Sequence, residues 1–365
     1  MKVLHSASML SFSPGIYKQM SWENESSLKM HINFTSKIFC PVGVYPDSEI
    51  IEFASFKKPK NIIEKFIYWI KLKYEYYNWL SEQQNKFDII LLRYSVHDPF
   101  LLKFLKEAKI PIYLVHHTLE LPELRSFNTV GKIRGFLEEK IGGKCIDESY
   151  GIICVTNEIK KFEISRLSKA NVNKPTYIYP NGILLKNNTS LSDKREDIPE
   201  LLFVASYFFD WHGLDLILKD IINNNDDFIL HIIGRVDDWQ KDIIKVDSRV
   251  RFHGLKSTKE IQEIAERCWV GLSSFSLDRK GMTEACTLKV REYLSMGLPV
   301  YAGHKDVFLE DFSYYMFGSP KIDFILAYAK KMRNINRIEI RSEANELINK
   351  EILLLNLYSY LGKKD

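Results

Sequence analysis

The chain contains 365 residues, which is long for one average domain and suits two domains of about 180 residues each. Hydrophobic residues make up 45% of the sequence and charged residues 27%, as in a soluble globular protein rather than a disordered or fibrous one. The formal net charge of +4 is small and no basic stripe runs through the sequence, so no nucleic acid is expected as a partner.

The cysteines and the amino terminus favour a cytoplasmic location. The five cysteines are odd in number, widely spaced and without metal-ligand spacing (Cys40, Cys145, Cys154, Cys268 and Cys286). A reducing compartment fits this usage. Residues 1–6 are too short and polar for a secretory signal, and no apolar run approaches the length of a membrane span. We therefore expect a cytoplasmic protein.

Apolar runs alternate with helical patterns through the first half of the chain, which is typical of a parallel α/β architecture. Strands are predicted over residues 3–8, 37–41, 88–93, 112–116, 151–156 and 176–179. Helices are predicted over residues 16–30, 60–84, 98–108, 132–147 and 157–168. These elements form an expected Rossmann-like domain over residues 1–180.

The second half repeats this alternation after residues 181–198, a stretch rich in Asn, Ser, Lys and Asp that is expected to link two domains. Strands are predicted over residues 201–205, 228–234, 250–254, 269–275 and 299–303, with helices over 213–222 and 258–267. The second helix begins with Ser257 and Glu260 at capping-box spacing. A second Rossmann-like domain is expected over residues 181–344, followed by a final segment, 345–365, with a helix over 345–362.

Residues 57–80 form a basic, aromatic-rich helical pattern with six lysines and two glutamates. Two interpretations fit. The helix packs on a sheet with its aromatic side chains inside and its lysines outside, or it lies on an anionic membrane surface. The second interpretation makes peripheral contact with the inner face of the plasma membrane an expectation to be tested.

Residues 283–300 hold the most informative pattern of the sequence. Thr287 is a predicted N-cap and Gly297 a predicted helix end, so Glu284 lies before the helix and Glu292 on its second turn. Backbone N–H groups at the helix start lie between the two carboxylates. This arrangement suits a ligand with hydroxyl groups at both ends and phosphate in the middle, such as a nucleotide sugar. The alternative is a surface helix with solvated glutamates.

The string Thr-Leu-Lys-Val-Arg-Glu-Tyr followed by Met-Gly-Leu-Pro-Val resembles the signature of retaining GT-B-fold glycosyltransferases similar to family 4, in the form seen in bacterial polysaccharide-assembly enzymes. The resemblance implies an α/β protein whose two Rossmann-like domains face each other across a cleft. Residues 1–180 would bind the acceptor and residues 181–344 the nucleotide sugar. Residues 345–365 would cross back to the first domain. Tyr179-Pro180-Asn181-Gly182 is similar to the turn that opens the family's donor domain.

The resemblance also assigns donor-binding roles around the signature helix. Glu292 would bind the ribose hydroxyls, since a carboxylate accepts two hydroxyl protons in parallel. Glu284 would contact the hydroxyls of the donor sugar and act in catalysis. Thr287, Leu288 and Lys289, at the helix start, would hold the diphosphate.

The segment from Phe203 to Asp215 matches the first donor-domain strand of the family and the helix after it, with one departure. Many family members carry an Arg after the strand and a Lys before the glycine, and here these positions are Tyr207 and His212. His212, Gly213 and Ser206 are expected at the donor. The missing positive charge is expected from Lys289, from Arg235 at a strand end, or from Arg279 and Lys280.

In the first domain, the resemblance assigns His117, at a strand end, to the reactive carbon of the sugar as a catalytic residue that orients the donor. Glu120 and Glu123, expected in a long loop, and Arg93 are acceptor-side candidates. Gly15 lies in a segment that resembles the glycine loop near the donor phosphates.

The expected reaction is transfer of a sugar, with retention, from a UDP- or GDP-sugar to a hydroxyl of a saccharide or polyprenyl-linked saccharide. The setting would be assembly of lipopolysaccharide, capsule or another bacterial surface polysaccharide. No Asp-x-Asp stands in a convincing loop, so no metal and no cofactor are expected. The alternatives are a GT-B-fold nucleotide-sugar epimerase and a non-catalytic nucleotide-sugar-binding subunit. Departures at Tyr207 and His212 motivate the latter.

Overall fold

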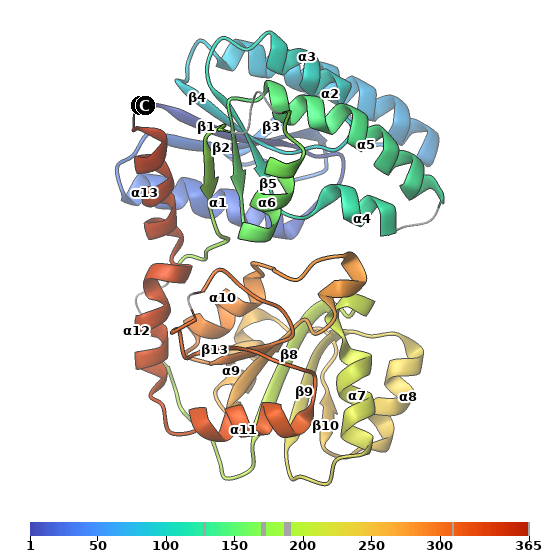
Figure 1. The fold of residues 1–365 in the computed structure, drawn as a ribbon, viewed down its shortest axis with the longest axis vertical. Coiled ribbons are helices and arrows are strands. Elements are labelled where there is room, and N and C mark those ends of the chain that lie inside the picture. Colours follow the sequence, from blue (N-terminus) through green and yellow to red (C-terminus); the bar gives the residue numbers. More distant parts are fainter. Residues whose placement is uncertain (127–128, 169–172, 186–190, 309, 364–365) are drawn as a thin grey trace. The chain divides into compact units, whose positions relative to one another are not determined.

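The protein is described here by a computed structural model that covers residues 1–126, 129–168, 173–185, 191–308 and 310–363 (Figure 1). The chain divides into two compact units. The first comprises Met1–Pro180 and Lys350–Asp365, and the second comprises Asn181–Asn349. The second unit therefore extends five residues beyond the expected boundary at 344, and the chain returns to the first unit at Lys350.

The first unit contains a seven-stranded parallel sheet in the order β3-β2-β1-β4-β5-β6-β7. Its strands are β1 (Val3–Ser8), β2 (Phe34–Val42), β3 (Ile51–Lys57), β4 (Ile89–Arg93), β5 (Ile112–His116), β6 (Gly151–Cys154) and β7 (Thr176–Ile178). Strand β3 was not predicted. It is an edge strand whose polar Glu52 and Ser55 interrupt the apolar run on which strand prediction depends.

Seven helices complete the described part of the first unit: α1 (Pro14–Lys29), α2 (Ile62–Gln83), α3 (Pro99–Lys106), α4 (Glu120–Ser126), α5 (Thr129–Glu148), α6 (Asn157–Ser165) and α13 (Lys350–Leu361). Side chains of Asn61, Asp98 and Thr156 accept backbone hydrogen bonds as N-caps of α2, α3 and α6. Helix α4 occupies the segment for which a long loop was predicted, so that expectation was wrong.

The last helix, α13, belongs to the core of the first unit. Leu354 and Leu357 are buried in one cluster with Val3, Phe34 and Leu91 from three strands. At the start of α13, the Lys350 ammonium lies 3.2 Å from the Tyr179 hydroxyl and 3.9 Å from a carboxylate oxygen of Glu23. The first unit is thus completed by residues from both ends of the described chain.

The second unit contains a six-stranded parallel sheet in the order β10-β9-β8-β11-β12-β13. Its strands are β8 (Glu200–Tyr207), β9 (Ile229–Arg235), β10 (Val250–Phe252), β11 (Val270–Ser273), β12 (Val300–Ala302) and β13 (Tyr315–Phe317). Strand β13 has three residues, which is too short for a recognisable period, and it was not predicted.

The helices of the second unit are α7 (Leu214–Ile222), α8 (Asp238–Val246), α9 (Thr258–Ala265), α10 (Leu288–Ser295), α11 (Ile322–Met332) and α12 (Arg337–Ile348), with short 3-10 helices η2 (Asp210–His212) and η3 (Leu277–Lys280). The Ser257–Glu260 capping box of α9 is confirmed. The single helix predicted over 345–362 was wrong, because Asn349 is extended (ψ 117°) and separates α12 from α13. Of the predicted linker 181–198, residues 186–190 lie outside the described residues.

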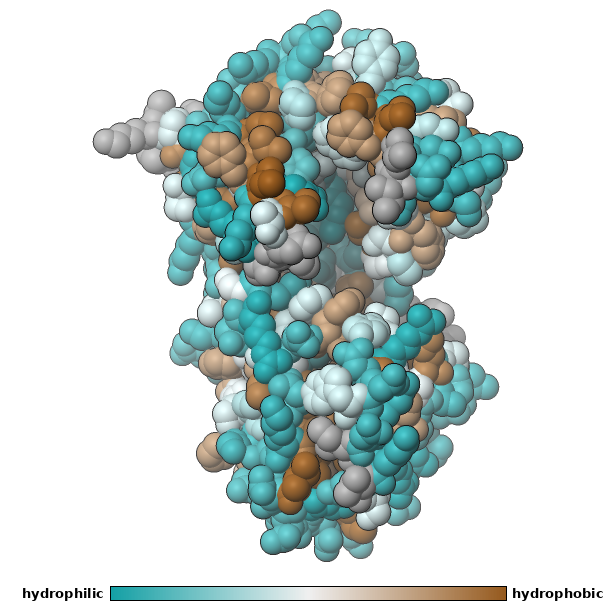
Figure 2. Space-filling model, turned by 90° about the vertical axis from the view of Figure 1, so that its right-hand side faces the viewer, coloured by the Kyte–Doolittle hydropathy of each residue, from teal (hydrophilic) through white to brown (hydrophobic). Residues whose placement is uncertain are grey.

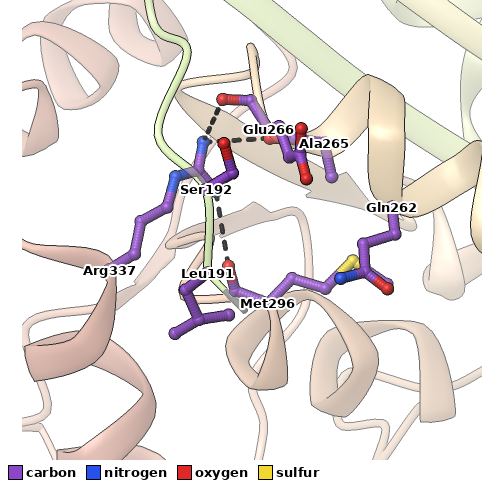
Figure 3. Close-up of a pocket in the computed structure, with 7 residues that line it drawn as sticks. All are labelled: Leu191, Ser192, Gln262, Ala265, Glu266, Met296 and Arg337. Atoms are coloured by element: carbon purple, nitrogen blue, oxygen red, sulfur yellow. Dashed lines mark hydrogen bonds between the residues drawn. The ribbon is translucent and has the colours of Figure 1, made fainter. Parts of the chain in front are cut away.

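Arg337 fastens the ends of two helices in the second unit. Figure 3 shows its side chain among the residues that line a small cavity, reaching toward the segments after α9 and α10. Its guanidinium donates to the carbonyl oxygens of Ala265 (2.9 Å), Cys268 (2.8 Å) and Met296 (3.3 Å). A basic side chain at a helix carboxyl end satisfies carbonyls that lack intrahelical partners. Arg337 therefore lines this cavity for a structural reason. It holds the carboxyl end of α10 in place through the Met296 carbonyl.

Candidate functional site

The turn after β8 lies at the carboxyl edge of the second sheet, where open α/β sheets bind ligands. Gly213 caps η2 and opens α7 with a φ of +67°, which L side chains rarely adopt. A Cβ atom at this position would lie 2.8 Å from the Cβ of Phe275. Gly213 is therefore required both by its backbone conformation and by the close approach of the loop that follows β11.

His212 is held as a neutral imidazole. Its Nδ1 accepts the backbone N–H of Phe209 at 3.0 Å, so the ring's single proton is on Nε2. Burial, together with the nearby Lys289 ammonium, lowers the His212 pKa to about 2. The residue can donate one hydrogen bond but cannot supply the charge of the lysine that it replaces.

Hydrogen bonds fasten η2 to the loop after β11. Phe275 N–H donates to the His212 carbonyl at 3.0 Å, and Ser276 N–H donates to the Trp211 carbonyl at 3.2 Å. Arg279, one expected source of positive charge, pairs with both oxygens of Asp215 at 2.9 and 3.0 Å. Asp215 thus balances the charge of Arg279 within the protein, which leaves Lys289 and Arg235 as the stronger candidates for the positive charge at the donor.

The signature helix α10 begins and ends at the expected residues. Thr287 has N-cap backbone geometry (φ −83°, ψ 142°), and Gly297 follows the helix with a φ of +64°. The Thr287 hydroxyl makes no capping hydrogen bond, however, and its buried Oγ1 has no hydrogen-bond partner among the described residues. The first turn of α10 therefore lacks the side-chain acceptor that normally satisfies its N–H groups.

Glu284 and Glu292 lie on either side of this helix start, and both are half-buried. Glu284 forms an isolated parallel bridge with Lys305, in which Ala285 N–H donates to the Lys305 carbonyl at 2.9 Å. Glu292 lies on the second turn of α10. Leu288 is the first helical residue and is also half-buried.

Lys289, on the first turn of α10, carries an ammonium with no hydrogen-bond partner among the described residues. It lies 5.6 Å from the centroid of the Phe203 ring, beside the β8 strand. Burial lowers the Lys289 pKa to about 7, and Glu292 offsets part of that effect. The fold therefore holds a partly desolvated, chargeable amine beside His212 and the uncapped helix start.

Arg291 was missed by the sequence analysis, although it lies within the signature. Its guanidinium pairs with both oxygens of buried Asp306 at 2.5 and 2.6 Å and donates from Nε to the Asn181 carbonyl at 3.0 Å. The Asn181 side chain donates to the Cys286 carbonyl at 2.6 Å. These contacts explain the Pro-Asn-Gly turn, which holds the segment between Glu284 and α10 in place.

The remaining donor-side candidates lie at strand ends. Ser206 and Arg235 are exposed at the carboxyl ends of β8 and β9. Tyr207, which replaces the expected Arg, donates its hydroxyl to the carboxylate of Asp237. The second unit therefore brings Ser206, His212, Gly213, Lys289 and Arg235 to one edge of its sheet.

In the first unit, His117 directly follows β5. Its buried Nε2 has no hydrogen-bond partner among the described residues, and burial together with the Arg93 charge holds its pKa well below the usual value. The Arg93 pKa is itself lowered to about 10 by burial, against the attraction of Glu120 and Glu23. Gly15 is the second residue of α1 rather than part of a loop, and a Cβ added there would meet nothing within 4 Å.

The two acceptor-side glutamates lie on α4 rather than in a loop, and each has a local partner. Glu120 accepts from His116 Nδ1 at 3.2 Å, and Glu123 accepts from the Thr118 hydroxyl at 2.8 Å. The sequence analysis missed buried His116, whose ring stacks on Tyr94 with centroids 4.3 Å apart. The double histidine at 116–117 was the only available signal.

A buried ion network lies behind His116. Arg166 donates to a carboxylate oxygen of Glu138 at 2.6 Å and to one of Glu163 at 2.9 Å. The Tyr94 hydroxyl donates to Glu138 at 2.6 Å. Glu138 lies on α5, Glu163 lies on α6 with Arg166 at its C-cap, and Tyr94 directly follows β4, so the network ties α5 to α6 and to the end of β4.

Two groups of described residues could offer three ligands to a metal ion: Glu200, His231 and Cys268, and His116, Glu120 and Glu163. In the first group, His231 Nε2 lies 2.7 Å from the Glu200 carboxylate and its Nδ1 lies 2.9 Å from His253 Nε2. Both ring nitrogens are thus partnered, and the group is a complete hydrogen-bond network at the amino-terminal edge of the sheet.

Helix α2, expected over residues 60–84, packs some of its aromatic side chains inside the unit and exposes others. Tyr76 and Tyr77 are buried, whereas Phe66, Ile67, Ile70 and Tyr74 are exposed. The buried ammonium of Lys73 lies 2.9 Å from a carboxylate oxygen of Asp98, so not every lysine of the segment faces outward. Among the described residues, no helix is long and apolar enough to cross a membrane.

Several solved structures that match nearly the whole chain are glycosyltransferases. The lipopolysaccharide outer core galactosyltransferase WaaB superimposes with a TM-score of 0.69 at 14% identity, over 99% of each chain. Anabaena HepE, solved with UDP and glucose, superimposes with a TM-score of 0.62 at 12% identity, over 98% of this chain and 99% of its own. The fold is GT-B.

The GT-B fold also occurs in a Listeria monocytogenes protein described as a UDP-N-acetylglucosamine 2-epimerase, with a TM-score of 0.55 at 10% identity over 99% of this chain and 96% of its own. No protein-family model matches the sequence, and none of the curated proteins matches it. At these identities the GT-B likeness establishes the architecture, and the activity has to be argued from the site.

Proposed function

We propose that this GT-B protein is a retaining glycosyltransferase that moves a sugar from a UDP- or GDP-sugar to a hydroxyl of a saccharide or polyprenyl-linked saccharide in bacterial surface polysaccharide assembly. One observation carries the proposal. The Lys289 ammonium has no hydrogen-bond partner among the described residues and lies at the uncapped start of α10, beside His212 and Gly213. An amine with these neighbours is suited to a diphosphate.

The two glutamates would set the orientation of the bound nucleotide sugar. Glu292 would accept hydrogen bonds from the ribose hydroxyls, and Glu284 would accept them from the donor sugar. Thr287, Leu288 and Lys289 would hold the diphosphate between them, because helix N–H groups and an ammonium both attract negative charge. HepE was solved with UDP and glucose, which supports a UDP-sugar as the donor class.

In the proposed reaction the bond between the anomeric carbon and the leaving phosphate oxygen breaks. The acceptor oxygen forms its bond on the same face of the sugar, and its proton passes to the leaving phosphate. Lys289 and the α10 N–H groups stabilise the developing charge of the nucleoside diphosphate, so no metal or other cofactor is needed. Neutral His117 would orient the sugar, with Arg93, Glu120 and Glu123 toward the acceptor.

A lipid-linked acceptor suits a protein that works at a membrane surface. Phe66, Ile67, Ile70 and Tyr74 form an exposed apolar stripe on α2, and exposed Lys65 and Lys71 lie on the same helix. This stripe supports peripheral contact of residues 57–80 with the inner face of the plasma membrane of a cytoplasmic protein.

Calorimetric titration with UDP, GDP and their sugars tests the donor site. Turnover that releases free nucleoside diphosphate only when an acceptor is added supports transfer. Conversion of the nucleotide sugar into its 2-epimer without acceptor supports the epimerase alternative, which the Listeria similarity favours. Binding without turnover indicates a non-catalytic subunit, and absence of binding to every nucleotide contradicts the proposal.

A further inference from the structure

Helix α5 has an unusual division of side chains between its two faces. Its buried positions include three glycines, Gly131, Gly135 and Gly142. In the first half of the helix the large apolar side chains are exposed instead: Val130 by 63%, Ile133 by 58%, Phe136 by 57% and Leu137 by 42%. A surface helix of a globular protein normally has the reverse arrangement, with its apolar stripe against the core.

Close packing explains the glycines but not the exposed side chains. A Cβ at Gly135 would lie 2.9 Å from Cγ of Arg125, and one at Gly142 would lie 2.5 Å from the Tyr94 hydroxyl. At Gly135 and Gly142, therefore, the inner face of α5 has no room for a larger side chain unless its neighbours move. Nothing in this packing requires Ile133 or Phe136 on the outer face, where polar side chains would be equally compatible with the fold.

The charges around this apolar stripe are mainly positive. Lys132, Arg134 and Lys140 are exposed on the same helix. Between residues 129 and 140 the one exposed carboxylate of α5 is that of Glu139, and it lies 2.7 Å from Arg125. The stripe is thus bordered by cations without a matching set of anions, and the Lys140 ammonium lies 5.8 Å from the Phe136 ring centroid.

We propose that the exposed face of α5, formed by Val130, Ile133, Phe136 and Leu137, docks on an anionic lipid bilayer. The apolar side chains enter the boundary between headgroups and acyl chains, and Lys132, Arg134 and Lys140 contact anionic headgroups. A symmetric contact with a second copy would instead bring these basic side chains together. The charge pattern therefore favours lipid over self-association.

This surface is separate from the apolar stripe of α2, and it does not depend on the proposed sugar transfer. Helix α3 contacts both α2 and α5, so the two exposed stripes belong to one layer of helices. Figure 2 shows brown, apolar side chains gathered on the upper unit, on the side where Figure 1 places α4 and α5. Docking through both stripes would fix the orientation of the first unit on the bilayer.

Co-sedimentation of the full chain with vesicles tests the proposal, using vesicles of phosphatidylcholine alone and vesicles of phosphatidylcholine mixed with anionic phosphatidylglycerol. We expect wild-type protein to bind the anionic vesicles. The double variant Ile133→Ser/Phe136→Ser should bind them at least about tenfold more weakly. Lys132→Gln/Lys140→Gln should lose roughly fivefold per charge at low salt.

Two matched variants keep the test specific. Ile338 is 65% exposed on α12 of the second unit, so Ile338→Ser removes a similar apolar side chain elsewhere and should leave vesicle binding unchanged. Phe66→Ser/Ile70→Ser tests the α2 stripe alone. If the α5 double variant binds like wild type while the α2 variant does not, the α5 proposal is wrong. A dimer by light scattering with no vesicle binding also overturns it.

Discussion

The Lys289 ammonium lies 5.6 Å from the centroid of the Phe203 ring and has no hydrogen-bond partner among the described residues. A buried amine whose ammonium has no hydrogen-bond partner is costly for the folded state, and Glu292 offsets only part of that cost. The cost has a functional explanation if an anionic ligand binds the Lys289 ammonium and supplies the missing hydrogen bonds. The first two predictions follow from this pair.

Replacing Lys289 by Met should separate binding from stability. Loss of a charge-assisted contact to the diphosphate should weaken UDP binding by about 10- to 100-fold in calorimetry. Removing a buried, unpaired ammonium should raise the free energy of unfolding at pH 6 by about 1–3 kcal/mol. Denaturant unfolding of both proteins measures the second effect. Unchanged UDP affinity would mean that Lys289 does not contact the diphosphate.

Donor affinity should depend on pH through the same group. The Lys289 pKa of about 7 means that the free protein carries this charge below pH 7 and loses it above. A bound diphosphate favours the charged form, so affinity for a nucleotide sugar should fall by roughly tenfold per pH unit above 7 and be flat below it. Calorimetry at pH 6, 7, 8 and 9 checks the slope, and Lys289→Met should remove it.

Substitution of the two glutamates of the signature should have different effects, one on nucleotide binding and the other on sugar transfer. Glu292→Ala should weaken binding of free UDP by about tenfold or more, because the ribose hydroxyls lose a charged acceptor. Glu284→Ala should bind free UDP like wild type and lose sugar transfer. Titration with UDP and single-turnover assays give the two readouts. Equal transfer rates in wild type and both variants would place the donor elsewhere.

Gly213 and Gly15 form a matched pair of substitutions. Gly213→Ala forces a Cβ into a left-handed backbone and against Phe275, and should cost about 1–3 kcal/mol of stability. Gly15→Ala, inside α1 with nothing within 4 Å, should leave stability unchanged or raise it by up to about 1 kcal/mol. Thermal unfolding compares them. An increased KM for the donor in Gly15→Ala would support its proposed place near the phosphates.

Loss of a cation from the buried network of the first unit should lower the free energy of unfolding more than loss of a cation from a surface ion pair. Arg166→Met leaves the buried carboxylates of Glu138 and Glu163 without their cation and should cost about 3–5 kcal/mol at pH 7. Burial raises the pKa of Glu163, so the loss should shrink at pH 5, where Glu163 takes up a proton more readily. Arg125→Met removes a half-exposed pair with Glu139 and should change stability by less than about 1 kcal/mol. Similar losses in the two variants would contradict this account.

The parts of the fold that the sequence predicted well are those with strong local patterns. Strand β5, helix α7 and the caps of α9 and α10 have clear periods or capping residues within a few positions. Helix α13 was extended backward over residues 345–349 because it is apolar on several sides, and such a run does not reveal where Asn349 breaks the helix. Helix α4, with seven residues, is too short for its period to be recognised.

The relative placement of candidate site residues could be derived from sequence spacing only where those residues are close in sequence. Glu284, Thr287, Lys289 and Glu292 fall within nine positions, so their common placement follows from helix geometry. Arg291 and Asp306 are 15 positions apart, and Tyr94 and Glu138 are 44 apart. Contacts of that kind depend on how strands are ordered in the sheet, which spacing alone does not reveal.

The return of the chain at Lys350 has a consequence for synthesis. Residues 181–349, the whole second unit, leave the ribosome before Lys350, Leu354 and Leu357, which complete the buried core of the first unit. We therefore expect the second unit to reach its native state first during translation, although its residues come later in the sequence than most of the first. Until α13 leaves the ribosome, the first unit keeps apolar surface exposed to which a chaperone could bind.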